Sequence, residues 1–180
     1  MAETSTTTST SGRAGARQTR RQNAEKGFKA SKELSDNLQA VLVDLIELAG
    51  QGKQAHWNIV GRNFRDLHRQ LDEIIEFARD SGDEVAERMR ALHAVPDGRS
   101  DTVAATTTLP EFPAGEVDTK DAVDLVTVRL EATVGTMREV HDAVDEEDPT
   151  SADILHAIIT VLEQHAWMVS AENRTVAKKG

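Results

Sequence analysis

The chain has 180 residues, which is enough for one domain with a sizeable core and too few for two. It carries 31 acidic against 21 basic side chains, a formal net charge of −10, so contact with nucleic acid needs a local basic segment. There is no cysteine, which excludes disulfides and thiolate metal sites, and no apolar run approaches the roughly 20 residues that span a bilayer. No secretory signal pattern is present near the start, so we expect a cytoplasmic protein without membrane contact.

Residues 1–27 differ in composition from the rest of the chain. A Thr/Ser-rich stretch is followed by a basic one, and such a segment cannot bury enough apolar surface to fold by itself. Through Lys32 its charge is +5, which leaves −15 for the remaining residues. We predict a mobile tail that either binds DNA phosphates without sequence preference or packs on a neighbouring subunit. Its candidate DNA-binding residues are Arg13, Arg17, Arg20, Arg21 and Lys26.

Residues 28–173 show the three- and four-residue spacing of apolar side chains that is typical of amphipathic helices. The first helix is expected to begin near Ser31 and to end at Gly61. The second follows Asn63, which is interpreted as its N-cap, and is closed by the Pro-Asp-Gly sequence at 96–98. The apolar faces of these helices comprise Leu34, Leu38, Val41, Leu42, Leu45, Ile46, Leu67, Leu71, Ile74, Ile75, Ala78, Val85, Met89 and Leu92.

A long connection is expected over residues 98–118, with one short helix near 100–106. A third helix follows, and Thr150 with Asp153 resembles a capping box that starts a fourth. Helices of about 25 residues with one long crossover predict an all-α, ferritin-like four-helix bundle, with a short basic tail at 174–180. The apolar faces of the last two helices comprise Val123, Val126, Leu130, Val134, Met137, Val144, Ile154, Leu155, Ile158, Val161, Leu162 and Met168.

Four side chains on one stripe of the second helix have metal-ligand chemistry: His68, Asp72, Asp83 and Glu87. Carboxylates and imidazoles suit iron. At about 1.5 Å per residue, Asp72 and Asp83 are about 16 Å apart along the helix, so the two pairs cannot form one site within one chain. An antiparallel copy of the helix across a two-fold axis would bring the pairs together. No Glu-x-x-His sequence occurs, which argues against a di-iron centre inside each bundle.

Three ordered segments carry a family resemblance. They are Lys53-Gln54-Ala55-His56-Trp57-Asn58 with Gly61, Asn63-Phe64, Leu67-His68 and Asp72; Asp83-Glu84-Val85-Ala86-Glu87-Arg88; and 148–155 with Trp167. With these spacings, the chain resembles the DNA-binding proteins from starved cells (Dps), in the actinobacterial form with a long N-terminal tail. The resemblance covers residues 34–173.

The resemblance implies a dodecameric hollow shell active in the stress response. Such a shell is a ferroxidase: it oxidises Fe(II), preferably with hydrogen peroxide, stores ferric mineral and protects DNA from oxidative damage. The resemblance also implies two-fold inter-subunit iron sites, whose catalytic ligands would be His56, His68 and Asp72 of one subunit with Asp83 and Glu87 of its partner.

Three further residues are weaker candidates. The resemblance places Trp57 close to the iron, although a core or interface packing role is an equally good interpretation. In Dps shells, acidic residues at the start of the fourth helix line pores that admit Fe(II). Asp148 and Asp153 are the candidates here, and a solvated acidic loop is the alternative.

Two other functions stay open. The chain could be a nucleoid-associated protein that compacts DNA through its basic tail, with iron oxidation secondary, since twelve tails would provide avidity. It could instead be a plain helical interaction module, which predicts a monomer or small dimer.

Overall fold

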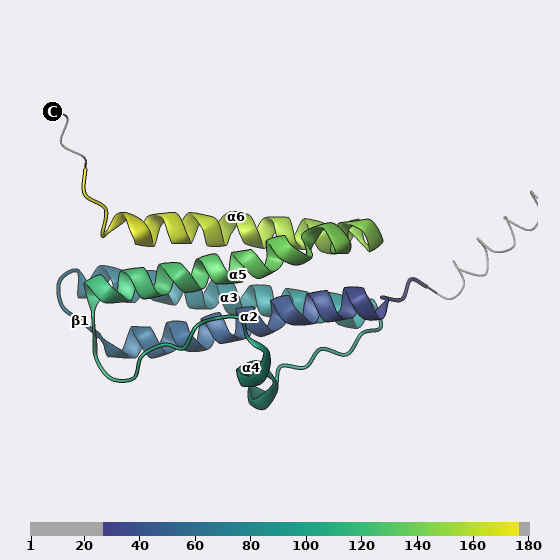
Figure 1. Cartoon of the computed structure of the whole chain (residues 1–180), viewed down its shortest axis with the longest axis horizontal. Coiled ribbons are helices and arrows are strands. Elements are labelled where there is room, and N and C mark those ends of the chain that lie inside the picture. The colour runs from purple at the N-terminus through teal and green to yellow at the C-terminus, as the bar shows by residue number, and fades with distance from the viewer. Residues whose placement is uncertain (1–26, 177–180) are drawn as a thin grey trace, which may run out of the picture.

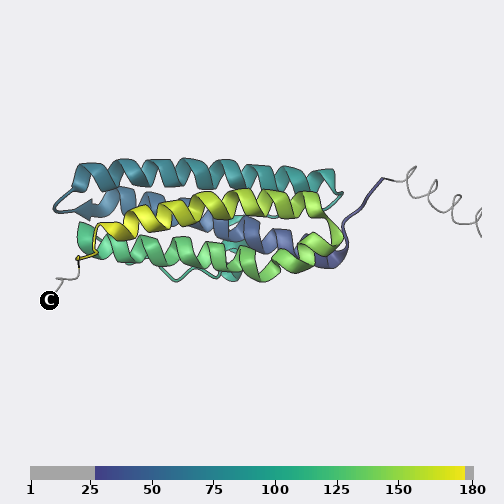
Figure 2. The ribbon, with the colours of Figure 1, turned by 90° about the horizontal axis from the view of Figure 1, so that it is seen from above.

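The computed structural model describes residues 27–176, which form a bundle of four long helices (Figures 1 and 2). Helix α2 packs along α3, and α5 packs along α6. The crossover after α3 returns the chain to the end of the bundle where α3 began, so α5 runs in the same direction as α3. The helices are α2 Lys32–Asn58, α3 Phe64–Ala91, α4 Ser100–Thr106, α5 Thr119–Glu147 and α6 Pro149–Ala171.

The core is the apolar stripe of each long helix, as the spacing predicted. Most of the predicted residues are buried, while Ile46, Ile154 and Val161 are only half-buried. The prediction for Met168 is wrong: its side chain is 45% exposed, because α6 is apolar on more than one face and only one face meets the bundle. No helix within residues 27–176 has the length and apolar character needed to cross a membrane.

The helix starts differ from the expected capping in two places. Asn63 does precede α3, but it adopts a left-handed conformation (φ 57°) and makes no side-chain cap. Its amide instead donates to Glu172 Oε2 over 3.1 Å. The capping box of Thr150 and Asp153 is wrong, because α6 already begins at Pro149. Proline suits a first helical position, since its fixed φ is helical and its missing N–H would have had no partner.

Two short strands join the end of the crossover to the connection between α2 and α3. Strand β1 (Ile59–Val60) pairs in parallel with β2 (Val117–Asp118), with Ile59 opposite Val117. Gly61 follows with φ 123°, and a Cβ there would lie 2.9 Å from the Asp118 carboxylate, so this turn requires glycine. The sequence did not predict the strands, because two residues are too few to show an alternating pattern.

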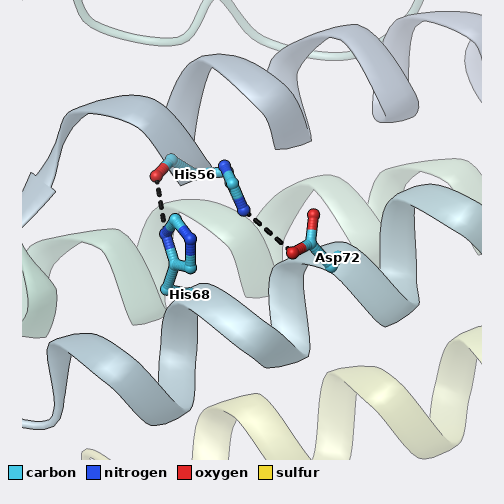
Figure 3. Close-up of side chains that lie close together, drawn as sticks. All are labelled: His56, His68 and Asp72. Carbon is cyan, nitrogen blue, oxygen red and sulfur yellow. Dashed lines mark hydrogen bonds and ion pairs between the residues drawn. The ribbon is translucent and has the colours of Figure 1, made fainter.

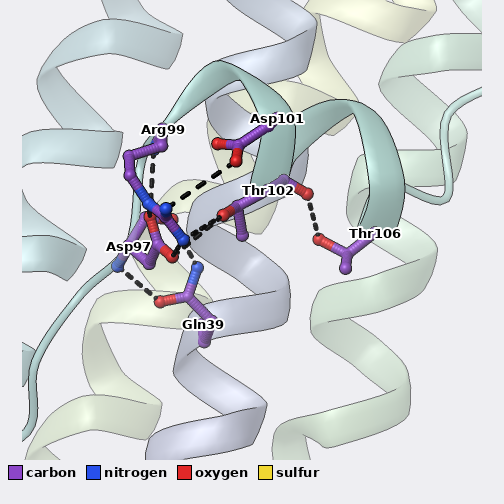
Figure 4. A network of polar contacts seen from close by, with 6 residues as sticks. All are labelled: Gln39, Asp97, Arg99, Asp101, Thr102 and Thr106. Carbon is purple, nitrogen blue, oxygen red and sulfur yellow. Dashed lines mark hydrogen bonds and ion pairs between the residues drawn. The ribbon is translucent and has the colours of Figure 1, made fainter.

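A polar network fixes the start of the crossover on α2 (Figure 4). The Gln39 amide donates to the Asp97 carbonyl and accepts from the Asp97 N–H, each over 2.8 Å. Arg99 Nη2 and the Thr102 hydroxyl donate to Asp97 Oδ2 over 2.7 and 2.9 Å. These donors, Arg99 first, hold the pKa of Asp97 well below its ordinary value. The network places α4 against α2. Helix α4 confirms the short helix that the sequence predicted near residues 100–106.

Hydrogen bonds to the buried carboxylate of Asp44 hold the middle of the crossover against the bundle. Its carboxylate is 1% exposed and accepts hydrogen bonds from Thr107 Oγ1 (2.8 Å), from Thr108 N (2.9 Å) and Oγ1 (2.6 Å), and from Thr136 Oγ1 (2.7 Å). A buried carboxylate is tolerated only when its oxygens are hydrogen-bonded. The Thr run of the connection therefore supplies donors to a charge on α2.

Arg129 holds the end of the crossover. Its guanidinium is buried, donates to Gln51 Oε1 and to the carbonyls of Pro110 and Glu111, and lies 4.9 Å from the centre of the Phe112 ring. Burial lowers the pKa of Arg129. The carbonyls of Pro110 and Glu111 lie in irregular structure and have no helical partner, and Arg129 on α5 donates hydrogen bonds to them.

Candidate metal centre

Three of the predicted ligands converge near the β1 end of the bundle (Figure 3). His56 comes from the last turn of α2, and His68 and Asp72 lie one turn apart on α3. One ligand atom from each residue lies within 4.8 Å of the others. Among residues 27–176 this is the one cluster of three or more metal-ligating side chains with such spacing. The packing of α2 along α3 brings together residues that are twelve positions apart.

The imidazole ring of His56 is buried without hydrogen bonds to other described residues. Its side chain is 11% exposed, and both ring nitrogens are buried without a hydrogen bond in the described chain. Nε2 lies 3.0 Å from Asp72 Oδ2, an ion-pair distance without hydrogen-bond geometry. Buried polar nitrogens without partners are rare because they forfeit hydration. A cation bound between His56 and Asp72 would satisfy one of them.

His68 is oriented by the backbone of its neighbour. Its Nδ1 lies 3.0 Å from the His56 carbonyl oxygen, which can only accept, so Nδ1 carries the proton and donates. Nε2 of a neutral His68 ring therefore keeps its lone pair for a metal ion. The His56 and His68 rings stack at 3.6 Å between centroids, and Phe64 covers His68 at 5.1 Å. A carbonyl that orients a ligand histidine is a usual feature of metal sites.

Lys53 pairs with Asp72 Oδ1, the carboxylate oxygen that does not face His56. Its ammonium donates to Asp72 Oδ1 over 2.6 Å, and Asp72 is 51% exposed. Lys53 first, and His56 second, hold the pKa of the Asp72 carboxyl below its ordinary value, so the carboxylate stays charged and ready to bind a cation. Lys53 belongs to the motif that ends in His56, but the sequence alone indicates no role for it. Its position three residues before His56, on the same helix face, was the signal.

Asp83 and Glu87 lie apart from this cluster, as the helix geometry required. Both side chains are exposed on α3, and neither belongs to the group formed by His56, His68 and Asp72. Their placement leaves them accessible to another chain.

The weaker candidates have different surroundings. Trp57 is 71% exposed, so the interpretation of Trp57 as a core residue of its own subunit is wrong. Asp148 is 8% exposed and pairs with Arg88 Nη2 at 2.7 Å, while the Ser151 hydroxyl also donates to it. Asp153 is exposed. Of the two pore candidates, Asp153 is thus the one whose carboxylate faces solvent in the single subunit.

The predicted DNA-binding residues Arg13, Arg17, Arg20, Arg21 and Lys26 lie outside the described residues, as do residues 177–180.

Comparisons with known proteins agree with this fold. Residues 35–178 match the ferritin-like domain family, so the chain belongs to the ferritin-like class of protein. It is 32% identical over 145 residues to DNA protection during starvation protein 2 of Deinococcus radiodurans, covering 81% of this chain and 60% of that protein. It is 33% identical over 135 residues to the DNA protection during starvation protein of Agrobacterium fabrum, covering 74% of this chain and 83% of that protein.

A solved structure identifies the family within this class more closely. The Dps of Microbacterium arborescens, solved in its high iron form, superposes with a TM-score of 0.75 at 31% identity, covering 81% of this chain and 98% of that one. Within the ferritin-like class, the chain belongs to the Dps family.

Proposed function

We propose that this chain is the subunit of a dodecameric ferroxidase shell that oxidises Fe(II), preferably with hydrogen peroxide, and stores the ferric product. The observation that carries the proposal is the cluster of His56, His68 and Asp72, whose ligand atoms lie within 4.8 Å of one another and include unpartnered buried nitrogens. Asp83 and Glu87 would complete the site from the two-fold partner, because α3 places them about 16 and about 22 Å from Asp72 along the helix within the same chain.

The ligand set suits iron that changes oxidation state. Neutral imidazole nitrogens and carboxylate oxygens bind Fe(II), and added carboxylates favour the more highly charged Fe(III). Two Fe(II) ions give up one electron each, the O–O bond of one peroxide molecule breaks, and two protons complete two molecules of water. Because peroxide is consumed by two electrons at once, no hydroxyl radical is released. DNA would be protected by this chemistry even without contact with the shell.

Anaerobic addition of Fe(II), followed by hydrogen peroxide, tests the proposal through the ferric absorbance. The His68→Ala and Asp83→Ala variants should each lose the fast phase, since each removes one half of every shared site. In a mixture of the two variants refolded together, about half of the dimers would be mixed, and each of these has one intact site of two. We therefore expect recovery of about a quarter of the wild-type rate.

The matched control is His93→Gln, which changes an exposed histidine at the end of α3, outside the cluster, and should oxidise iron like the wild type. Wild-type oxidation no faster than buffer would refute the ferroxidase activity. No recovery in the mixture, with both single variants inactive and correctly assembled, would refute the shared site alone.

The basic tail favours a second function. The net charge is +5 through Lys32 and −15 for the rest, so this segment is positive while the remainder of the chain is negative. Non-specific DNA binding by twelve such tails is compatible with the ferroxidase and is tested separately below.

A further inference from the structure

A second pair of histidines lies between α5 and α6, away from the cluster at the β1 end. His141 on α5 and His156 on α6 stack with ring centroids 4.3 Å apart and planes inclined by 30°. They border an open groove between the two helices. The junction of α5 and α6 lies at the end of the bundle opposite β1 (Figure 1), so this groove is separate from the ferroxidase cluster. Its other lining residues are Arg138, Asp142, Ile159, Thr160 and Glu163.

The tautomer of His141 follows from its neighbour. Its Nδ1 lies 3.1 Å from Asp142 Oδ1, and an ionised carboxylate can only accept, so Nδ1 of the neutral ring carries the proton. Nε2 then holds a lone pair. This Nε2 atom is buried and has no hydrogen-bond partner in the described chain. A carboxylate that accepts from the far nitrogen of a histidine is the usual support of a metal-binding imidazole.

We propose that His141 and His156 form a binding site for a divalent transition-metal ion with a preference for nitrogen ligands, such as Zn²⁺ or Co²⁺. His141 Nε2 and one ring nitrogen of His156 are the protein ligands, and water in the open groove fills the other positions. Two nitrogen ligands without a direct carboxylate favour these ions over Fe(II). The proposal does not depend on the ferroxidase site.

The surroundings permit this coordination. His156 is exposed, and its ring makes no hydrogen bond within residues 27–176, so it can turn from the stacked position to meet the ion. The one arginine or lysine among the described residues that line the groove is Arg138, whose Nη2 donates to Glu163 Oε1 over 2.5 Å. The charge of Arg138 is thus balanced by Glu163 and opposes a bound ion less.

Equilibrium dialysis of the full-length, assembled protein against Zn²⁺ tests the site. The parent carries His68→Ala and Asp72→Ala, so that the ferroxidase cluster contributes no ion. We expect about one Zn²⁺ per chain, and at least a ten-fold loss of affinity in both His141→Gln and His156→Gln. Asp142→Asn should weaken binding less, because it alters only the support of His141. Co²⁺ should give a visible absorption band in the parent that both histidine variants lose.

His93→Gln in the same parent is the control and should bind as the parent does. Gel filtration and circular dichroism establish that each variant is folded and assembled. His156→Gln alone is informative even if His141→Gln fails to fold, because the His156 side chain is exposed. Zn²⁺ binding that is unchanged in His156→Gln, or absent from the parent, would overturn the proposal.

Discussion

At the residue scale, the Lys53 ammonium pairs with Asp72 Oδ1 and balances the charge of a carboxylate that a metal ion would bind. The ammonium nitrogen and Oδ1 lie 2.6 Å apart, so an Fe(II) ion bound to this carboxylate would be repelled by the charge of Lys53. Lys53→Gln should therefore raise Fe(II) affinity, by about two- to five-fold, since partly exposed pairs contribute little. Anaerobic calorimetry measures this change, with Lys120→Gln, an exposed lysine on α5, as control. Weaker binding in Lys53→Gln would mean that the lysine supports the site rather than competing for it.

His165 predicts a pH dependence of stability. Burial lowers its pKa from the ordinary 6.5, with Glu73 acting weakly in the opposite direction, and its ring faces Phe77 at 6.3 Å between centroids. The unfolded chain then takes up the proton at a higher pH than the folded chain. The neutral His165 ring therefore contributes to the stability of the folded state. This stabilisation is constant above pH 6.5 and is lost as the pH falls through 6.5 toward the lower pKa of the folded state.

His165→Gln removes the titrating group while keeping a polar side chain of moderate size. From about pH 7.5 to about pH 5, the melting temperature of the wild type should fall more than that of His165→Gln. Parallel curves for the two proteins, measured at one protein concentration, would contradict this account.

At the scale of elements, the crossover is a long irregular segment that is held by charges on helices. Asp44→Ala should leave the Thr108 N–H and the threonine hydroxyls without their acceptor, and we expect a loss of about 2–4 kcal/mol in stability. Asp44→Asn keeps the shape and one acceptor oxygen, so the loss should be smaller.

Urea unfolding measures this effect, and limited proteolysis shows where it acts. Cleavage of Asp44→Ala should increase within residues 98–118 before the long helices are cut. Glu131→Ala, which changes an exposed carboxylate on α5, is the control. Equal losses in Glu131→Ala would show that charge alone, rather than the buried network, is responsible.

At the scale of the whole molecule, the charge distribution predicts that the two proposed functions, iron oxidation and DNA binding, can be separated by deleting the basic tail. A protein that lacks residues 1–27 should fail to retard DNA while keeping the wild-type rate of iron oxidation, because the predicted ligands all lie on α2 and α3. Retardation by the full-length protein should weaken steeply as salt rises, as phosphate contacts do. DNA binding that survives the deletion would assign it to another surface. Gel filtration of either protein should give about twelve chains; a monomer would contradict the shell.

The amino-acid sequence by itself determined the four helices, the crossover and the separation of His68 and Asp72 from Asp83 and Glu87 along α3. Apolar spacing follows directly from the helical period, and the rise of about 1.5 Å per residue was sufficient to separate Asp72 from Asp83. The helix caps were predicted less reliably, because the side chain of a capping residue can form a tertiary contact instead. Asn63 donates to Glu172 instead of capping α3, and Pro149 starts α6 ahead of the expected capping box.

Only the tertiary structure decided how side chains from different elements meet. The sequence placed His56 in the same motif as His68 without showing that α2 and α3 bring them within ligand distance, with Lys53 on the shared carboxylate. It also gave no sign that His141 and His156 stack across α5 and α6. Contacts between helices depend on the rotation and offset of both partners, whereas a helix face depends only on the spacing within one segment.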